Sequence, residues 1–334
     1  MTRFHNTTKG FTLLEMLVAT TILVLLVVIG MGAVNGTFNL ASQATQRIDA
    51  NRVARESLDE IGRELSVAAV PFNRQNTVSS VQLLIDPPNV LPAQAVANSD
   101  SMFWQAPLAH NRDYGNLAVV GYFVISDTTS TNALNWRLQL RRVYIEPETS
   151  GTTANTNYLL YSGTNITTSG TTPWLSGATA ASFAPSSGSS DVSNGLSGWV
   201  ADGVLAMWVR CLDKSGNPIL QNAAGVNYTS PAPLYNSCTA YTSGSTSTYN
   251  PYSYPTTSYT AMPAYVEVAI ACFAPSELAR IKSLPAVPAT DRVNFLSGTG
   301  ATSIPGYLQA FRSANPGVKS TEIFSRRFRI YSSD

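Results

Sequence analysis

Residues 9–34 read KGFTLLEMLVATTILVLLVVIGMGAV, and this stretch decides how the chain begins. From Met16 to Val34 the residues are nearly all apolar, and no charged side chain occurs between Met16 and Gln46. About 20 apolar residues suffice for one helical crossing of a membrane. A secretory signal peptide has an apolar region of only about 7–15 residues. We therefore expect a membrane-spanning helix over residues 11–36.

Glu15 is the charged residue at the mouth of this apolar run. A carboxylate costs about 2.5–3.5 kcal/mol at the centre of a bilayer, and less towards the interface. Such a group needs a partner, which makes Glu15 the first candidate functional residue. The alternative is a plain signal anchor in which the carboxylate lies incidentally near the membrane surface.

Residues 10–15, Gly-Phe-Thr-Leu-Leu-Glu, resemble the processing site of type IV pilins and type II secretion pseudopilins. The resemblance implies that a prepilin peptidase cuts after Gly10 and methylates the new amine of Phe11. It also implies that Glu15 pairs with the N-terminal amine of a neighbouring subunit during assembly. The leader would then be residues 1–10, which carry Arg3 and Lys9 and no acid. That charge suits a cytoplasmic segment under the positive-inside bias.

The segment of residues 37–70 reads as an amphipathic extension of the same helix. It has no proline, and Pro71 marks its expected end. Its charges form opposite pairs at i,i+4, namely Arg52–Glu56, Arg55–Asp59 and Asp59–Arg63. Apolar residues at roughly helical spacing predict the face that packs on a sheet: Ala41, Ala44, Ile48, Leu58, Ile61 and Leu65.

Residues 71–334 read as a β-rich globular domain with two long uncharged polar loops, 149–190 and 215–266. The strand-like runs are Val81–Ile85, Leu117–Ile125, Trp136–Tyr144, Val204–Cys211, Tyr265–Phe273 and Phe324–Tyr331. The expected fold class is therefore α+β and pilin-like. A long N-terminal helix, membrane-spanning in its first half, packs on a C-terminal antiparallel β-sheet domain.

Three later segments resemble strands of minor pilin W and minor pseudopilin J. They are residues 199–213, where Asp-Gly-Val opens a strand, residues 261–270, entered from a proline, and the closing residues 324–331. The uncharged loops make this chain longer than a typical J-type subunit. In that respect it also resembles the long prepilin-like proteins of verrucomicrobial gene cassettes.

The composition favours an exported protein and argues against several chemistries. Charged residues are 12% of the chain, about half of the roughly 25% found in typical globular domains. The formal net charge is +1. There is no basic tract, so nucleic-acid binding is not implied. Three cysteines, Cys211, Cys238 and Cys272, are candidates for one disulfide in an oxidising compartment. Packing of the thiols as small buried hydrophobes is the equal alternative.

Catalytic patterns are scarce in this chain. It has two histidines, His5 in the leader and His110, and no Gly-x-Ser-x-Gly elbow or phosphate loop. We predict a surface position for His110. Asp202 and Asp213 offer oxygen ligands for Ca²⁺, but as turn residues at strand ends they need no ion. The sequence thus predicts no enzyme, no cofactor and no metal.

The function that these features predict is a minor pilin-like or pseudopilin-like subunit. Its partners would be prepilin peptidase, other pilins or pseudopilins, and the inner membrane. It would be single-pass with its C-terminal domain in the periplasm, or part of an extracellular filament. One alternative is a membrane-anchored surface adhesin, because eight of the 15 tyrosines lie between Tyr228 and Tyr265. Those rings could bind carbohydrate or a partner, or pin a loop to the core. Another is an exported hydrolase on a signal anchor.

Overall fold

The structure is a computed structural model that describes residues 12–69, 83–87, 90–110, 116–128, 136–146, 183, 197–213, 215–218, 235–236, 263–298, 300–304 and 306–330. The chain divides into two compact units, residues 1–45 and 46–334. The predicted leader, Phe11, Pro71, Cys238 and most of the two uncharged stretches lie outside the described residues.

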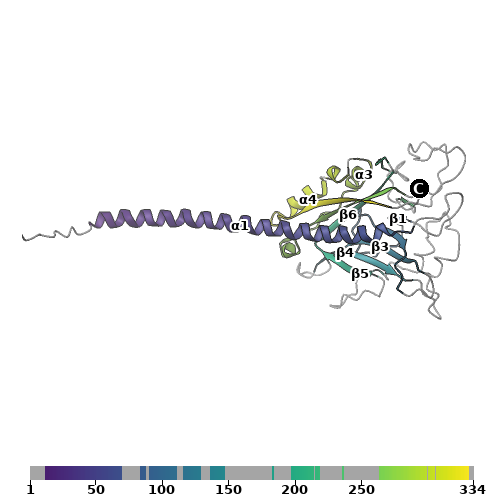
Figure 1. Cartoon of the computed structure of the whole chain (residues 1–334). Helices are drawn as coiled ribbons and strands as arrows, with labels where there is room; N and C mark the ends of the chain where they lie inside the picture. The colour runs from purple at the N-terminus through teal and green to yellow at the C-terminus, as the bar shows by residue number, and fades with distance from the viewer. Residues whose placement is uncertain are drawn as a thin grey trace, which may run out of the picture. The chain divides into compact units, whose positions relative to one another are not determined.

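Helix α1 (Leu13–Ser66) contributes to both units (Figure 1). In the first unit its apolar side chains are exposed from Leu13 to Leu40. Among the described residues, α1 is the one helix long and apolar enough to cross a membrane. The helix continues through Gly30, Gly32 and Gly36, where an added Cβ would meet no other atom within 4 Å.

In the second unit, the C-terminal part of α1 buries one face, as an amphipathic helix does. The predicted core positions Leu58, Ile61 and Leu65 are buried. Ala41 and Ala44 are exposed, and so is Ile48 (66%), so the prediction of these three as packing residues is wrong. Ile48 lies about 140° around the helix from Ile61. The buried face of α1 is Gln46, Ala50, Val53, Ala54, Ser57, Leu58, Ile61, Glu64 and Leu65.

Two antiparallel sheets form the body of the second unit, where the sequence suggested one. Sheet A has the order β5-β4-β3-β2-β1-β7, and sheet B has the order β6-β8-β9. The strands of sheet A are β1 (Leu83–Ile85), β2 (Met102–Ala106), β3 (Ala118–Asp127), β4 (Arg137–Ile145), β5 (Ser197–Asp202) and β7 (Tyr235–Asn236). Those of sheet B are β6 (Val204–Leu212), β8 (Tyr265–Cys272) and β9 (Glu322–Arg329).

The six predicted strand runs correspond to β1, β3, β4, β6, β8 and β9, while β2, β5 and β7 were not foreseen. Nor were the helical segments of the last seventy residues. These are η3 (Pro275–Arg280), α3 (Ala289–Ser297), η4 (Gly300–Ser303) and α4 (Gly306–Ala314).

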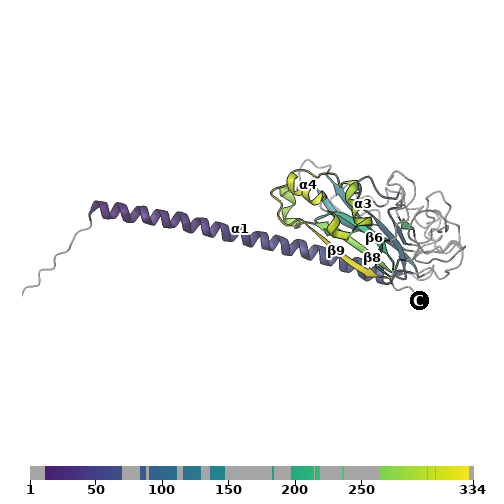
Figure 2. The same cartoon turned by 90° about the horizontal axis from the view of Figure 1, so that it is seen from above.

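The hydrophobic core has layers on both faces of sheet B. Alternate side chains of a strand point to opposite faces, so Met207 and Val209 of β6 pack in the cluster that contains Leu58 and Ile61 of α1. Trp208 points the other way and packs in a second cluster with residues of α3 and α4. Figure 2 shows α3 and α4 on the side of sheet B away from α1. A third cluster lies on sheet A around Phe103, Phe123 and Phe183.

Gly203 joins the two sheets, since β5 belongs to sheet A and β6 to sheet B. Its N–H donates to the Leu138 carbonyl (2.9 Å), and its carbonyl accepts from the N–H of Phe273 (2.9 Å). Its φ is +80°, and a Cβ would lie 2.4 Å from the Phe273 oxygen. Glycine is therefore required here both for the backbone conformation and for the close approach.

The outer edge of β6 is closed by Ser99 and Asp100 rather than by another strand. The N–H of Asp100 donates to the Met207 carbonyl (2.7 Å), and the Val209 N–H donates to Asp100 Oδ2 (2.8 Å). The Met207 N–H donates to Ser99 Oγ (2.9 Å). Arg292 of α3 lies 2.5 Å from the same carboxylate. Covering an edge in this way protects it from unwanted strand pairing.

Buried polar contacts fix α1 on the sheets. Glu64 accepts from Tyr122 Oη (2.5 Å) and forms an ion pair with Arg142 (2.5 Å). Nearer the start of the second unit, the amide of Gln46 bridges Glu277 Oε1 (2.9 Å) and Arg280 Nη1 (3.0 Å). The Glu64 carboxylate can be buried because Tyr122 donates to it and Arg142 pairs with its charge.

The charges on the exposed face of α1 are paired differently from the i,i+4 prediction. Arg52 pairs with Asp49 and Arg63 pairs with Glu60, both at a spacing of three residues. Asp59, for which the sequence suggested partners on the helix itself, contacts Arg326 of β9. Tertiary contact with β9 therefore replaces a local pair.

Candidate functional site

The start of α1 is a capping box formed by Thr12 and Glu15. Leu13 is the first helical residue, so Thr12 is the N-cap and Glu15 the third residue of the helix. The Thr12 N–H donates to Glu15 Oε2 (2.9 Å), and the Glu15 N–H donates to Thr12 Oγ1 (3.3 Å). The Thr12 hydroxyl also donates to Glu15 Oε2 (3.0 Å). This reciprocal arrangement satisfies two backbone donors that a helix start leaves unpaired.

Glu15 therefore has a local partner, which the sequence interpretation missed. The signal was present, because Thr-x-x-Glu before an apolar run is the sequence pattern of a capping box. A negative charge in the first turn also interacts favourably with the helix dipole. A cap of this kind stabilises a helix by about 0.5–2 kcal/mol.

The cap lies at the head of a long apolar surface. The side chains of Leu13, Leu14, Met16 and Leu17 are all more than half exposed, and the exposed apolar residues continue to Leu40. A soluble protein rarely exposes so large an apolar surface, so this part of α1 is built for a membrane or for neighbouring helices. From Leu13 to Leu40, Glu15 is the sole acidic residue of α1.

His110 is exposed, as predicted, with 83% of its side chain accessible. Its Nδ1 lies 2.8 Å from both Tyr144 Oη and Glu146 Oε1. The Tyr144 hydroxyl in turn donates to the Leu108 carbonyl (2.7 Å). These bonds tie the segment around residue 110 to the end of β4.

Asp202 and Asp213 lie at opposite ends of β6, so they cannot share one ion. Asp202 ends β5 and accepts a hydrogen bond from Gln139 (2.9 Å). Asp213 accepts from the backbone N–H of Asn217 (2.7 Å) and so closes the turn after β6. Both carboxylates act as turn and strand-end residues, which was the alternative to calcium binding.

The β6–β8 register excludes one pairing of the three candidate cysteines, a disulfide between Cys211 and Cys272; Cys238 lies outside the described residues. The thiols of Cys211 and Cys272 are free and buried, and burial raises the pKa of each. In the β6–β8 ladder Cys211 stands opposite Val266, six residues from Cys272 along β8. Six residues of strand span about 20 Å, whereas a disulfide needs Cα atoms within about 7 Å. Both residues pack as small hydrophobes in the core.

Two of the eight clustered tyrosines lie in the described part of the chain. Tyr235 is buried and pairs β7 with β1, and Tyr265 begins β8. These two rings serve the sheets, which agrees with a structural role. The other six are outside the described residues.

Taken together, the fold and the helix start define a pilin-like class: a long N-terminal helix, apolar in its first half, that packs on antiparallel sheets in its second. Residues 5–31 match the family model described as the prokaryotic N-terminal methylation motif. This match supports the type IV pilin and pseudopilin family, whose members are structural rather than enzymatic. It implies processing by a prepilin peptidase, anchoring in a membrane and assembly with other pilins. No curated protein matches the chain.

Proposed function

We propose that this protein is a minor pilin-like or pseudopilin-like subunit, cut after Gly10, methylated on Phe11 and assembled through α1. The observation that carries the proposal is the methylation motif over residues 5–31, which runs directly into a capped apolar helix. We assign residues 1–10 to the leader, 11–36 to the membrane, 37–70 to the helix extension and 71–334 to the periplasmic or extracellular domain.

Cleavage after Gly10 would place a cationic amine one residue before the N-cap. An N-terminal amine has a pKa near 8 and is charged at neutral pH. Brought among apolar helices it needs a counter-charge, because an unpaired buried charge costs about 3–5 kcal/mol. Glu15 of a neighbouring subunit supplies that charge. The pairing would draw on the same carboxylate group whose Oε2 accepts from Thr12 in the isolated chain.

The narrower assignment, to subunits like minor pilin W or pseudopilin J, rests on the sequence resemblance of three segments. These segments include β6 and most of β8 and β9, which are neighbours in one antiparallel sheet. The Asp202-Gly203-Val204 sequence forms the entry to β6. The choice between a pilus and a type II secretion filament rests on which assembly genes accompany the chain.

The test is processing in cells that carry a prepilin peptidase. Gly10→Val puts a branched side chain at the cleavage position, and we expect a precursor that keeps residues 1–10 and stays in the membrane. N-terminal sequencing and mass spectrometry should find N-methylphenylalanine in the parent chain and an intact leader in the variant.

Thr8→Val is the control, since it places a valine two residues before Gly10 at a position that already has a branched side chain. It should be processed normally. Normal cleavage of Gly10→Val would contradict the assignment. A parent chain that keeps Met1 would favour the membrane-anchored adhesin, and a cut beyond residue 30 would favour secretion.

A further inference from the structure

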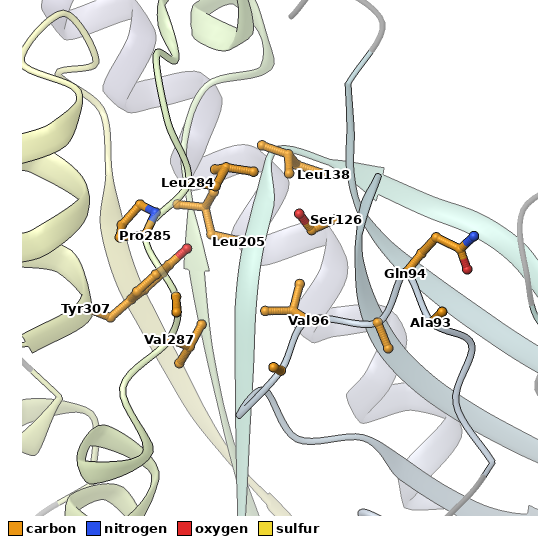
Figure 3. Close-up of a pocket in the computed structure, with 13 residues that line it drawn as sticks. Ala93, Gln94, Val96, Ser126, Leu138, Leu205, Leu284, Pro285, Val287 and Tyr307 are labelled. Carbon is orange, nitrogen blue, oxygen red and sulfur yellow. The ribbon is translucent and has the colours of Figure 1, made fainter. Parts of the chain in front are cut away.

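An apolar recess of about 200 Å³ lies in the second unit, away from α1. One wall is the segment of residues 93–97, which lies along the end of β3, and the other is the extended segment of residues 284–287. Leu138 of β4, Leu205 of β6 and Tyr307 of α4 complete the lining (Figure 3).

The recess has no charged side chain in its lining. Alanine, valine, leucine and proline supply most of the wall, with the amide of Gln94 and the hydroxyls of Ser126 and Tyr307 as neutral polar groups. An uncharged apolar wall disfavours an ionic guest, which would lose its hydration without gaining a partner. A cavity of about 150 Å³ lined by apolar side chains holds a benzene ring. The recess therefore suits one neutral ring with a small substituent.

Tyr307 provides the specific element of this recess. Its side chain is 2% exposed, and its hydroxyl points into the recess (Figure 3). No hydrogen bond to that hydroxyl is formed by any residue that the structure describes. The hydroxyl is the polar tip of an otherwise buried side chain, and a ligand atom that enters the recess can form a hydrogen bond with it. Burial also raises the pKa of Tyr307, which keeps it a neutral donor and acceptor.

The ring of Tyr307 is held firmly in place. The Asp291 carboxylate of α3 accepts from the Tyr307 N–H (2.6 Å) and so fixes the start of α4. Trp208 packs edge-on against the ring at 6.2 Å, and Phe311 lies 6.3 Å away on the same helix. The hydroxyl is thus positioned before any guest arrives, which lowers the entropy cost of binding.

We propose that this recess binds a neutral phenol ring, the tyrosine side chain of a partner polypeptide, through apolar contact and one hydrogen bond to Tyr307. Tyrosine presents an apolar body and a polar tip, which matches an apolar wall with a hydroxyl inside it. The exposed Ala93, Ala97 and Ala286 at the rim leave the recess open to a side chain from another chain. This inference goes beyond the assembly role of α1 and does not depend on it.

The experiment uses the full chain in detergent with methyl-labelled alanine, because Ala93, Ala95, Ala97 and Ala286 line the recess and report on it directly. N-acetyltyrosinamide is the probe, and N-acetylphenylalaninamide is the matched probe without the hydroxyl. We expect saturable shifts of these four methyl signals with the tyrosine probe. The phenylalanine probe should bind about two- to tenfold more weakly, as the loss of one hydrogen bond implies.

Two variants and two control variants locate the effect. Tyr307→Phe keeps the ring and should remove the preference for the tyrosine probe. Ala286→Phe adds bulk at the rim and should abolish the shifts, whereas Ala289→Phe, at an exposed alanine outside the lining, should leave them unchanged. Glu15→Ala should bind the probe normally, which separates this site from the proposed assembly function.

Absence of shifts at the four methyls would overturn the proposal. So would equal affinity for the two probes, because the hydroxyl would then have no role. If Tyr307→Phe still prefers the tyrosine probe, another group forms the hydrogen bond with the hydroxyl of the probe. That result would overturn the assignment to Tyr307.

Discussion

The backbone N–H of Thr12 and the carboxylate of Glu15 are joined by a 2.9 Å hydrogen bond, and the Thr12 hydroxyl donates to the same oxygen at 3.0 Å. The residue proposed to recruit a neighbouring subunit therefore also starts its own helix. Capping needs a hydrogen-bond acceptor, whereas recruitment of an amine needs a negative charge. The two roles can be separated by substitution.

Glu15→Gln keeps an acceptor at the third helix position, because glutamine also completes a capping box. It removes the charge that an amine would require. We expect the variant to insert into the membrane, to be cleaved and to keep its helix content by circular dichroism. Recovery of partner prepilins in a pull-down should fall at least about tenfold, since an unpaired buried amine costs about 3–5 kcal/mol.

Thr12→Val is the complementary variant. It removes the cap and leaves the carboxylate, so it should lower the stability of the helix start by about 0.5–2 kcal/mol. Thr12→Ser should behave like the parent chain. If Glu15→Gln assembles normally while Thr12→Val does not, capping and not charge pairing is the function of Glu15.

A truncation at the boundary of the two units should yield a soluble monomer. A chain that begins at Ala44 removes the exposed apolar surface and keeps Gln46, the first buried residue of α1. We expect it to be β-rich by circular dichroism and monomeric by light scattering. A chain that begins at Arg47 loses the Gln46 amide between Glu277 and Arg280 and should be less stable by about 0.5–1.5 kcal/mol in urea. Aggregation of the chain that begins at Ala44 would show that the core depends on residues 1–43.

Gly203→Ala should destabilise the second unit. The substitution forces a side chain into a φ of +80° and places a Cβ 2.4 Å from the Phe273 oxygen. Strain of this kind costs about 1–3 kcal/mol before the clash is counted, so we expect a loss of at least about 2 kcal/mol in urea denaturation. Gly198→Ala is the control, because a Cβ there meets nothing within 4 Å. Equal stabilities would mean that the link between sheets A and B tolerates movement.

Protonation of Asp100 should stabilise the second unit at mildly acidic pH. Burial raises the pKa of its carboxyl to about 6, against the opposing attraction of Arg292. The folded state therefore holds the proton more tightly than the unfolded state, whose pKa is near 3.8. This contribution is complete below pH 4 and is lost as the pH rises through 6.

The comparison variant is Asp100→Asn, whose amide oxygen can still accept from the Val209 N–H. Urea denaturation from pH 4 to pH 7 should show the parent chain losing up to about 3 kcal/mol relative to the variant as the pH rises. Parallel stability curves would mean that Asp100 does not titrate in this range.

The sequence alone determined the features that depend on local composition. An uncharged apolar run preceded by one carboxylate predicts a membrane-length helix, whatever the rest of the chain does. The six strand runs were found because β-branched and aromatic residues cluster between turn residues. The capping box was also readable from Thr12 and Glu15. Each of these signals lies within a few residues of sequence, so no distant contact was needed to find it.

Only the tertiary structure decided which residues meet across the fold. Ile48 is as apolar as Ile61, yet the helix turns it to the exposed side. Cys211 and Cys272 both lie in strands, but the β6–β8 register keeps them apart. Gly203 joins the two sheets through its N–H and its carbonyl. The recess at Tyr307 is assembled from segments that are nearly two hundred residues apart. Such arrangements follow from register and packing between distant segments, which local sequence patterns do not encode.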